Sequence, residues 1–311
     1  MRKLNYYDKL GLKNEVQVFE YFAKTITPSN QSFEYWNNWN KILKIFSEYE
    51  DDLNILDSLC GSKNFEEDLK ELLTNNISII RVFPMLLAIR DEIDRGSAAK
   101  KIMIMENKDL PDFKYKLYDF ENEPKGEGYM DEIILFFQQS GLKKLITQMN
   151  LSSIKDFALG VELGLDSNGR KSRGGKAMEE IVDSLLKNVY KLNESEYIFQ
   201  ATSKKVKDYW GLDIPTDKTS RRMDYMVKKS NKLFWIETNF YNGPGSKLKS
   251  TAGEYKDLFD FCKSNDLIFI WITDGRGWYT SLNALQEAYN YTDYVFNLNM
   301  IKNGILNELW D

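Results

Sequence analysis

The spacing of hydrophobic residues divides the chain into two parts near residue 150. In residues 1–150, apolar positions recur at the three- and four-residue spacing of helices, and strand-like alternation is rare. Prolines and glycines are spread through 107–128, which predicts a loop or a short hairpin there. The first part is therefore predicted to be mainly helical, with helices at 15–25, 38–48, 65–73, 79–94 and 131–149.

In the second part, 151–311, helical and strand patterns alternate. The strand patterns are a hairpin at 223–240, a strong apolar run at 267–273 and a short run at 294–298. This order predicts an α/β (α+β) fold in which helices flank a mixed sheet. The helices are expected at 177–190, 251–263 and 281–289, with another at the C-terminus.

The hairpin at 223–240 contains the most informative polar residues of the chain. Its polar turn is either residues 230–231 or residues 229–232, and in both cases the numbers of paired residues sum to 461. Asp224 is then directly opposite Glu237, with β-carbons roughly 4.5–5.5 Å apart. Asn239 projects from the same face because side chains alternate along a strand.

Two carboxylates at that separation repel each other unless a proton or a cation lies between them. The apolar residues around Glu237 on both faces predict a buried strand, and a buried carboxylate needs a partner. A divalent cation satisfies both requirements, and Mg²⁺ suits a site made of oxygen ligands. The alternative is a surface hairpin with acidic residues of no special role. Beyond the strand, residues 242–246 break the pattern, and Lys247 follows as a cation that could fold back over the strand end.

Composition removes several classes of chemistry. The 311 residues include no histidine, which excludes histidine bases, triads and metal sites. The two cysteines, Cys60 and Cys262, match no zinc or redox spacing. The N-terminus lacks an apolar signal region, and the most apolar stretch, 77–89, is interrupted by Arg81 and Pro84. We therefore expect no membrane span and a cytoplasmic protein.

Positive charge is concentrated around the proposed acid pair, although the net charge is −5. Residues 201–232 hold nine lysines and arginines against four aspartates. Residues 169–176 hold four basic residues and no acid: Arg170, Lys171, Arg173 and Lys176. A positive rim around an acidic pocket is suited to binding and hydrolysing a polyanion. A solvated lysine face is the alternative interpretation.

The helix predicted at 177–190 has a continuous apolar stripe. At about 100° per residue, Glu179 lies roughly 90° from the centre of the stripe and Glu180 nearly opposite it. Glu179 can thus reach a site on the sheet, whereas Glu180 should face solvent. The basic, glycine-rich segment 170–176 leads into this helix, and a helix N-terminus favours phosphate. A flexible loop with a helix cap is the alternative.

Three runs stand out in the second part: GVELGLDSNGRKSRGG at 160–175, IETNFY followed by GSKL within 236–248, and WITDGRGW at 271–278. Together they resemble the DpnII/MboI family of type II restriction endonucleases. The resemblance is strongest between about 150 and 290. It implies a PD-(D/E)xK nuclease fold, a homodimer and dependence on Mg²⁺. It also implies cleavage of double-stranded DNA at GATC, ahead of the G, when the adenine is unmethylated.

The resemblance assigns Asp224 and Glu237 as the metal-binding acids. Asn239 occupies the position where the superfamily usually has a lysine, so the positive charge that stabilises the transition state must come from elsewhere. Lys247 is our candidate for that charge, and Glu179 completes the catalytic set. The expected reaction is in-line attack on phosphorus by a metal-activated water, with departure of the 3′ oxygen.

A palindromic site calls for a twofold-symmetric dimer, in which each subunit reads one half. Arginine and lysine contact guanine, and asparagine contacts adenine. For Arg276, a tight turn whose Trp278 packs in the core is an equal alternative. The DNA-contact candidates are Asn168, Arg170, Lys171, Arg173, Lys176 and Arg276.

Two other classes remain open at this stage: a DNA-binding protein without hydrolytic activity, and a PD-(D/E)xK nuclease of different specificity. The first would need the basic rim without the opposed acids. The second would need the acids without a GATC reader. Region 1–150 could form a dimer interface, embrace the far side of the duplex or complete the core.

Overall fold

The chain forms two compact units. A computed structural model describes residues 3–91, 98–107, 114–122, 128–149 and 151–310. One unit is Trp36–Arg170, and the other combines Met1–Tyr35 with Lys171–Asp311. This division differs from the predicted boundary near 150, because the first 35 residues pack with the C-terminal part and the boundary itself falls at residue 170.

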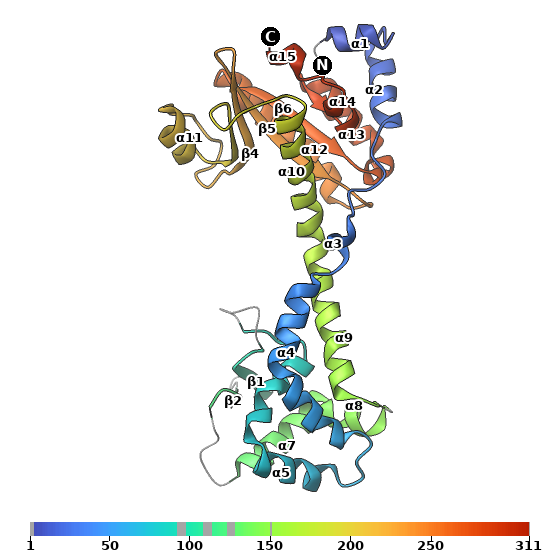
Figure 1. Ribbon diagram of the computed structural model, residues 1–311, viewed down its shortest axis with the longest axis vertical. Helices are drawn as coiled ribbons and strands as arrows, with labels where there is room; N and C mark the ends of the chain where they lie inside the picture. The colour runs from blue at the N-terminus through green and yellow to red at the C-terminus, as the bar shows by residue number, and fades with distance from the viewer. Residues whose placement is uncertain (1–2, 92–97, 108–113, 123–127, 150, 311) are drawn as a thin grey trace. The chain divides into compact units, whose positions relative to one another are not determined.

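A five-stranded mixed sheet is the centre of the second unit, hereafter the sheet unit (Figure 1). Its strands lie in chain order, with β3 to β5 antiparallel and β5 to β7 parallel. The fold class predicted from the sequence is thereby confirmed. The strands are β3 (Tyr197–Ala201), β4 (Met223–Lys229), β5 (Lys232–Phe240), β6 (Ile268–Asp274) and β7 (Val295–Phe296).

The two longest helices of this unit contact opposite faces of the hairpin. Tyr225 on β4 donates a hydrogen bond to the backbone of α10 (Arg170–Asn188). Trp235, on the other face of β5, packs edge-on against Phe261 of α12 (Lys247–Ser264). The helices around them are α1 (Asn5–Lys9), α2 (Glu15–Lys24), α11 (Ser203–Trp210), α13 (Leu282–Tyr291), α14 (Leu298–Lys302) and α15 (Asn307–Trp310).

One buried carboxylate explains why the N-terminal segment belongs to the sheet unit. Asp274, at the end of β6, is fully buried. It accepts hydrogen bonds from the Thr27 backbone N–H and hydroxyl at 2.6 and 2.8 Å, and from the Leu298 N–H at 2.9 Å. Because a buried carboxylate is costly without such partners, this network fixes residues from three distant parts of the sequence.

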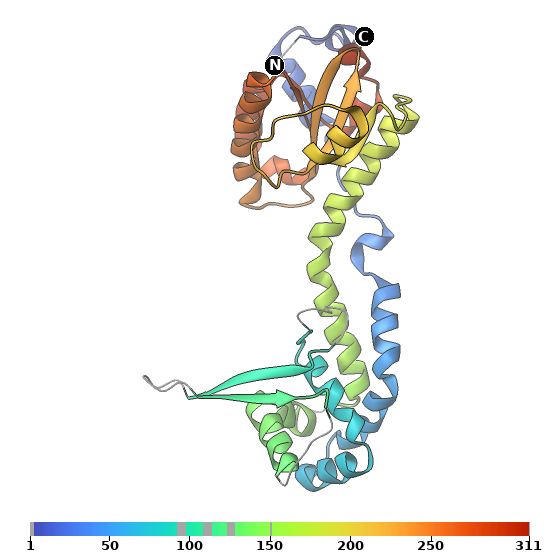
Figure 2. The ribbon, with the colours of Figure 1, turned by 90° about the vertical axis from the view of Figure 1, so that its left-hand side faces the viewer.

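The other unit, hereafter the helical unit, has its own apolar core and a two-stranded ribbon of β1 (Lys101–Asn107) and β2 (Lys114–Asp119). Figure 2 shows this ribbon extending from the helices. A short helix, α3 (Phe33–Trp36), spans the boundary between the units. The longer helices are α4 (Trp39–Leu56), α5 (Phe65–Asn75), α7 (Tyr129–Ser140), α8 (Leu142–Gln148) and α9 (Ile154–Asp166).

Two predicted helices of this region differ from the structure. The prediction at 79–94 is wrong where the chain is described: Ile77–Val82 is a 3₁₀ helix and α6 is only Phe83–Leu86. Pro84 has no N–H and fits only in the first turn of a helix. The helix at 131–149 is divided by Gly141, whose φ of 82° interrupts the helical path. Within the described residues, none of the helices has the length and apolarity needed to cross a membrane.

Candidate active site

The β4–β5 hairpin has the predicted register. Ser230 and Asn231 form its two-residue turn with φ of 49° and 59°, and positive φ at both positions defines a type I′ turn. Pairs such as Tyr225 with Ile236 and Lys229 with Lys232 all have residue numbers that sum to 461. One further step in this register brings Asp224 level with Glu237.

Asp224 lies at the start of β4 and is half-buried. Its Oδ2 accepts hydrogen bonds from the backbone N–H and the hydroxyl of Thr238, each at 2.8 Å. Burial raises the pKa of this carboxyl, and repulsion from Glu179 adds to the rise, whereas the Thr238 donors and Arg222 oppose it. Thr238 thus holds one carboxylate oxygen in a fixed position.

Glu237 is 6% exposed. Its Oε1 accepts a hydrogen bond from the Trp235 indole at 2.7 Å, and the Tyr255 hydroxyl lies 3.5 Å from its Oε2. Burial, followed by repulsion from Asp224, raises the pKa of Glu237 to about 8. The two carboxylates therefore repel each other, and a cation placed between them would stabilise the charged form of both.

Asn239 is held at both ends of its amide. Its Oδ1 accepts from the Trp271 indole at 2.8 Å, and its Nδ2 donates to the Tyr255 hydroxyl at 3.0 Å. Because the Tyr255 oxygen accepts from Asn239, its own proton is directed towards Glu237. The residue at the usual lysine position thus belongs to a hydrogen-bonded chain that orients an acid, and it brings no charge.

Glu179 lies on α10, where its Oε2 accepts from the Gln200 amide at 2.8 Å. Its charge contributes to the raised pKa of Asp224, so it lies within electrostatic reach of the acid pair. Glu180 is exposed and pairs with Lys176 at 3.5 Å. The helical projection made from the sequence is confirmed for both glutamates.

Lys247 is exposed at the first position of α12. The cations with the largest effects on the pKa values of the two acids are Arg221, which acts on Glu237, and Arg222, which acts on Asp224. Arg221 forms a two-pronged contact with Asp217. Sequence reasoning missed both arginines, although their position directly before Met223 was a usable signal.

The basic segment 170–176 is part of α10 and not a loop leading into it, so the predicted phosphate site at a helix N-terminus near residue 177 is wrong. Gly174 is helical, and a β-carbon there would lie 3.6 Å from the Tyr35 ring. That is ordinary van der Waals contact, so space alone does not require glycine at this position. Arg173 Nε donates to the Tyr35 carbonyl at 2.8 Å, and Lys171 is exposed.

Two of the other predicted DNA contacts, Asn168 and Arg170, lie in the helical unit. Asn168 is exposed in a 3₁₀ turn, Ser167–Gly169. The Arg170 guanidinium stacks 5.7 Å from the centre of the Trp36 ring, and its Nε donates to the Trp36 carbonyl at 3.0 Å. Arg170 therefore has a structural partner within this unit.

Arg276 is exposed, and its Nε donates to the Asn242 carbonyl at 2.9 Å. Trp278 is fully buried, with its indole donating to the Thr273 hydroxyl at 2.8 Å. The flanking glycines are required by space, since a β-carbon on Gly275 would lie 2.4 Å from the Tyr241 carbonyl. The tight turn with a core tryptophan is observed, and it leaves Arg276 on the surface.

The acid pair suits a hard cation. Both carboxyls have raised pKa values, and their oxygens match the ligands that Mg²⁺ and Ca²⁺ prefer. Across the described ranges, no set of three or more His, Cys, Asp or Glu side chains is arranged to hold a metal. A cation at this pair would thus have two protein carboxylates and complete its shell with water or substrate oxygens.

Comparison with known proteins identifies the family. The model of the DpnII restriction endonuclease family matches residues 18–308. The chain belongs to this family. It is 39% identical to the type II restriction enzyme MjaIII of Methanocaldococcus jannaschii, over 94% of this chain and 98% of that protein. It is 33% identical to the type II restriction enzyme DpnII of Streptococcus pneumoniae, over 95% and 99%. The chain is accordingly a type II site-specific deoxyribonuclease.

Proposed function

We propose that this DpnII-family enzyme cleaves double-stranded DNA at GATC, before the G, when the adenine is unmethylated. We further propose that it acts as a cytoplasmic homodimer and uses Mg²⁺. The observation that supports the catalytic part is the register of the hairpin, in which Tyr225 pairs with Ile236 and Asp224 and Glu237 are the next residues along the two strands. The specificity is the one that the family resemblance implies.

In this proposal Asp224 and Glu237 hold the Mg²⁺, which when bound acidifies a water and neutralises charge on the scissile phosphate. Thr238 fixes one oxygen of Asp224, and Trp235 fixes one oxygen of Glu237. Because both acids are oriented before substrate arrives, little reorganisation is needed during the reaction.

The positive charge missing at Asn239 is assigned to the arginine pair before β4. Arg222 is exposed, and its charge acts on Asp224, so it can contact a phosphate at the acid pair. Arg221 donates hydrogen bonds to Asp217, and its charge opposes the rise in the pKa of Glu237. Arg222 therefore replaces Lys247 as the first candidate for stabilising the phosphate. Arg221, which is bonded to Asp217, contributes only through its charge.

Digestion of plasmid DNA tests the whole proposal. Unmethylated plasmid with Mg²⁺ should give discrete fragments whose ends map to GATC, and the same plasmid methylated at that adenine should remain intact. Discrete fragments at another sequence, or nicking without defined ends, would reject the proposed specificity. Equal cutting of methylated and unmethylated DNA would reject the methylation sensitivity alone.

A further inference from the structure

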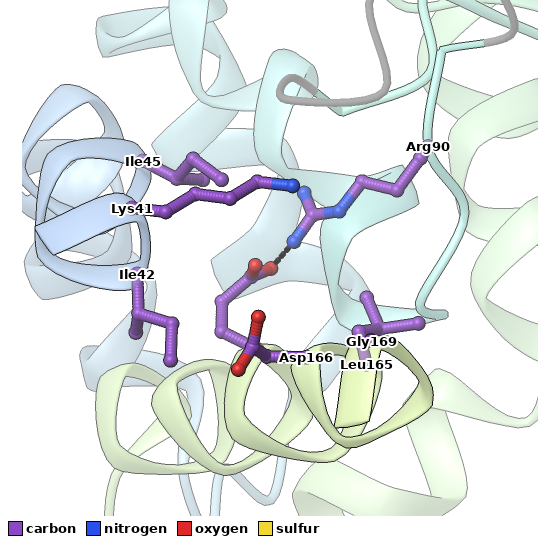
Figure 3. Close-up of a pocket in the computed structure, with 8 residues that line it drawn as sticks. Lys41, Ile42, Ile45, Arg90, Leu165, Asp166 and Gly169 are labelled. Atoms are coloured by element: carbon purple, nitrogen blue, oxygen red, sulfur yellow. Dashed lines mark ion pairs between the residues drawn. The ribbon is translucent and has the colours of Figure 1, made fainter. Parts of the chain in front are cut away.

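A cavity of about 210 Å³ lies inside the helical unit, between α4, α9 and the segment that ends at Arg90 (Figure 3). Its apolar wall consists of Ile42, Ile45 and Leu165. A water molecule occupies about 30 Å³ in the liquid, so the cavity has room for a group of several heavy atoms. It lies within one unit and shares no residue with the acid pair of the hairpin.

The acidic residues of this cavity already have partners. Glu162 is 4% exposed and forms an ion pair with Arg90. Asp166 accepts the backbone N–H of Asn38 on its Oδ2 at 2.9 Å.

The basic residues, in contrast, retain unused donors. Arg90 Nη1 is buried and makes no hydrogen bond within the described ranges. Lys41 is exposed at the edge of the cavity, and in the same ranges its ammonium group has no hydrogen bond or ion pair. Figure 3 shows the Lys41 ammonium and the Arg90 guanidinium pointing towards each other from opposite walls of the cavity. Glu162 neutralises only one of these two cations, and a buried donor without an acceptor, such as Arg90 Nη1, is costly.

We propose that this cavity binds a phosphate group through Arg90 and Lys41. A guanidinium presents paired donors that match phosphate oxygens, and a lysine adds a mobile point charge. The apolar wall suits the sugar or base attached to that phosphate. The phosphate group belongs either to the backbone of duplex DNA or to a free nucleotide. The first possibility rests on the proposed function, and the second does not.

The DNA source is tested by the salt dependence of binding. Affinity of the full-length protein for a GATC duplex is measured by fluorescence anisotropy in Ca²⁺ between low and moderate salt. Lys41→Gln should reduce the slope of log K against log salt by about one unit, which is the loss of one phosphate contact. Lys44→Gln is the matched control, because Lys44 is an exposed lysine one turn along the same helix that does not line the cavity.

The nucleotide source is tested by calorimetric titration of the protein with AMP and with inorganic phosphate. Wild-type protein and Lys44→Gln should bind with the same affinity, and Lys41→Gln should lose at least tenfold. Arg90→Gln alone would leave Glu162 buried without a partner, so Arg90→Gln/Glu162→Gln is used to keep a neutral hydrogen-bonding pair. Thermal melts establish that this double variant is folded, and its binding should fall as in Lys41→Gln.

A wild-type salt slope in both cavity variants, together with no heat from AMP or phosphate in the wild type, would overturn the proposal. A reduced slope without nucleotide binding identifies DNA as the source, and the reverse identifies a nucleotide. Cleavage of plasmid by the wild type is a separate readout. Failure to cut GATC would reject the proposed function while leaving the phosphate site to be judged by calorimetry.

Discussion

The acid pair of the sheet unit, Asp224 and Glu237, and the cavity of the helical unit differ in which buried polar group lacks a partner. At the acid pair, neighbouring residues donate hydrogen bonds to both carboxylates, and the remaining cost is the burial of the charged groups followed by the repulsion between them. In the cavity, Glu162 is ion-paired with Arg90, and a buried guanidinium donor is left without an acceptor. The first arrangement calls for a cation and the second for an anion. In each unit, the buried group without a partner thus indicates whether a cation or an anion would complete the site.

The largest expected effect follows from neutralising either acid at constant shape. Asp224→Asn and Glu237→Gln should each reduce the cleavage rate by at least about 10²-fold, the scale at which single groups that stabilise the transition state act. Melting temperatures should be unchanged or higher, since repulsion between the acids is removed. Gel-shift titration in Ca²⁺ reports whether DNA is still bound. Wild-type cleavage by both variants would remove the pair from the active site.

A smaller effect distinguishes the two candidate sources of positive charge. Arg222→Ala should slow cleavage by about tenfold, because one charged hydrogen bond to phosphate contributes roughly 1.5 kcal/mol or more. Lys247→Ala, which also removes one exposed cation close to β5, should leave the single-turnover rate close to that of the wild type. The reversed result would restore Lys247 as the replacement for the motif lysine.

The raised pKa of Glu237 predicts two pH effects of opposite direction. Since the carboxyl is protonated below a pKa of about 8, Mg²⁺ must displace a proton, and its apparent affinity should rise up to tenfold per pH unit towards that value. Without metal, the folded state binds more protons than the unfolded state between pH 4.5 and about 8, so folding stability should fall across that range. Melts of metal-free Glu237→Gln should lose this slope; an equal slope in the variant would assign it to other groups.

The smallest effect concerns the orientation of Glu237. Tyr255→Phe removes the hydroxyl that accepts from Asn239 and faces Glu237, so the Mg²⁺ concentration for half-maximal rate should rise several-fold. Tyr197→Phe is a matched control, because Tyr197 donates to Asp183 at 2.8 Å on another part of the sheet. Both variants should lose about 1 kcal/mol of stability. An unchanged Mg²⁺ requirement in Tyr255→Phe would reduce its hydroxyl to a packing role.

The part of the site that depends on local pattern was predictable from the sequence. Alternation of side chains and a short polar turn were sufficient to predict the hairpin register, in which Asp224 and Glu237 follow the pair of Tyr225 and Ile236. The parts that depend on distant contacts were not. Asp274 accepts hydrogen bonds from Thr27 and so joins the N-terminal segment to the sheet. The two residues are 247 positions apart, and no local sequence pattern predicts their contact.

Some local features were also misjudged. Two glycines in 170–176 suggested a loop, but the segment is helical from Arg170 onwards, and Arg173 on this helix donates a hydrogen bond to the Tyr35 carbonyl. β3 was not predicted, because its short run at Tyr197–Ala201 has no flanking turn signal as clear as that of the hairpin. Arg221 and Arg222 were counted only as part of a positive rim, since their nearness to the acids depends on the path of the chain into β4.

The two-residue turn at Ser230 and Asn231 makes the position of Glu237 sensitive to the length of the chain between the strands. Side chains alternate with a period of two, so one amino acid inserted between the strands would slip β5 by a single step and rotate every one of its side chains to the opposite surface. Glu237 would then exchange places with a hydrophobic neighbour. Insertions and deletions in this loop should consequently be far less tolerated than substitutions that preserve its length.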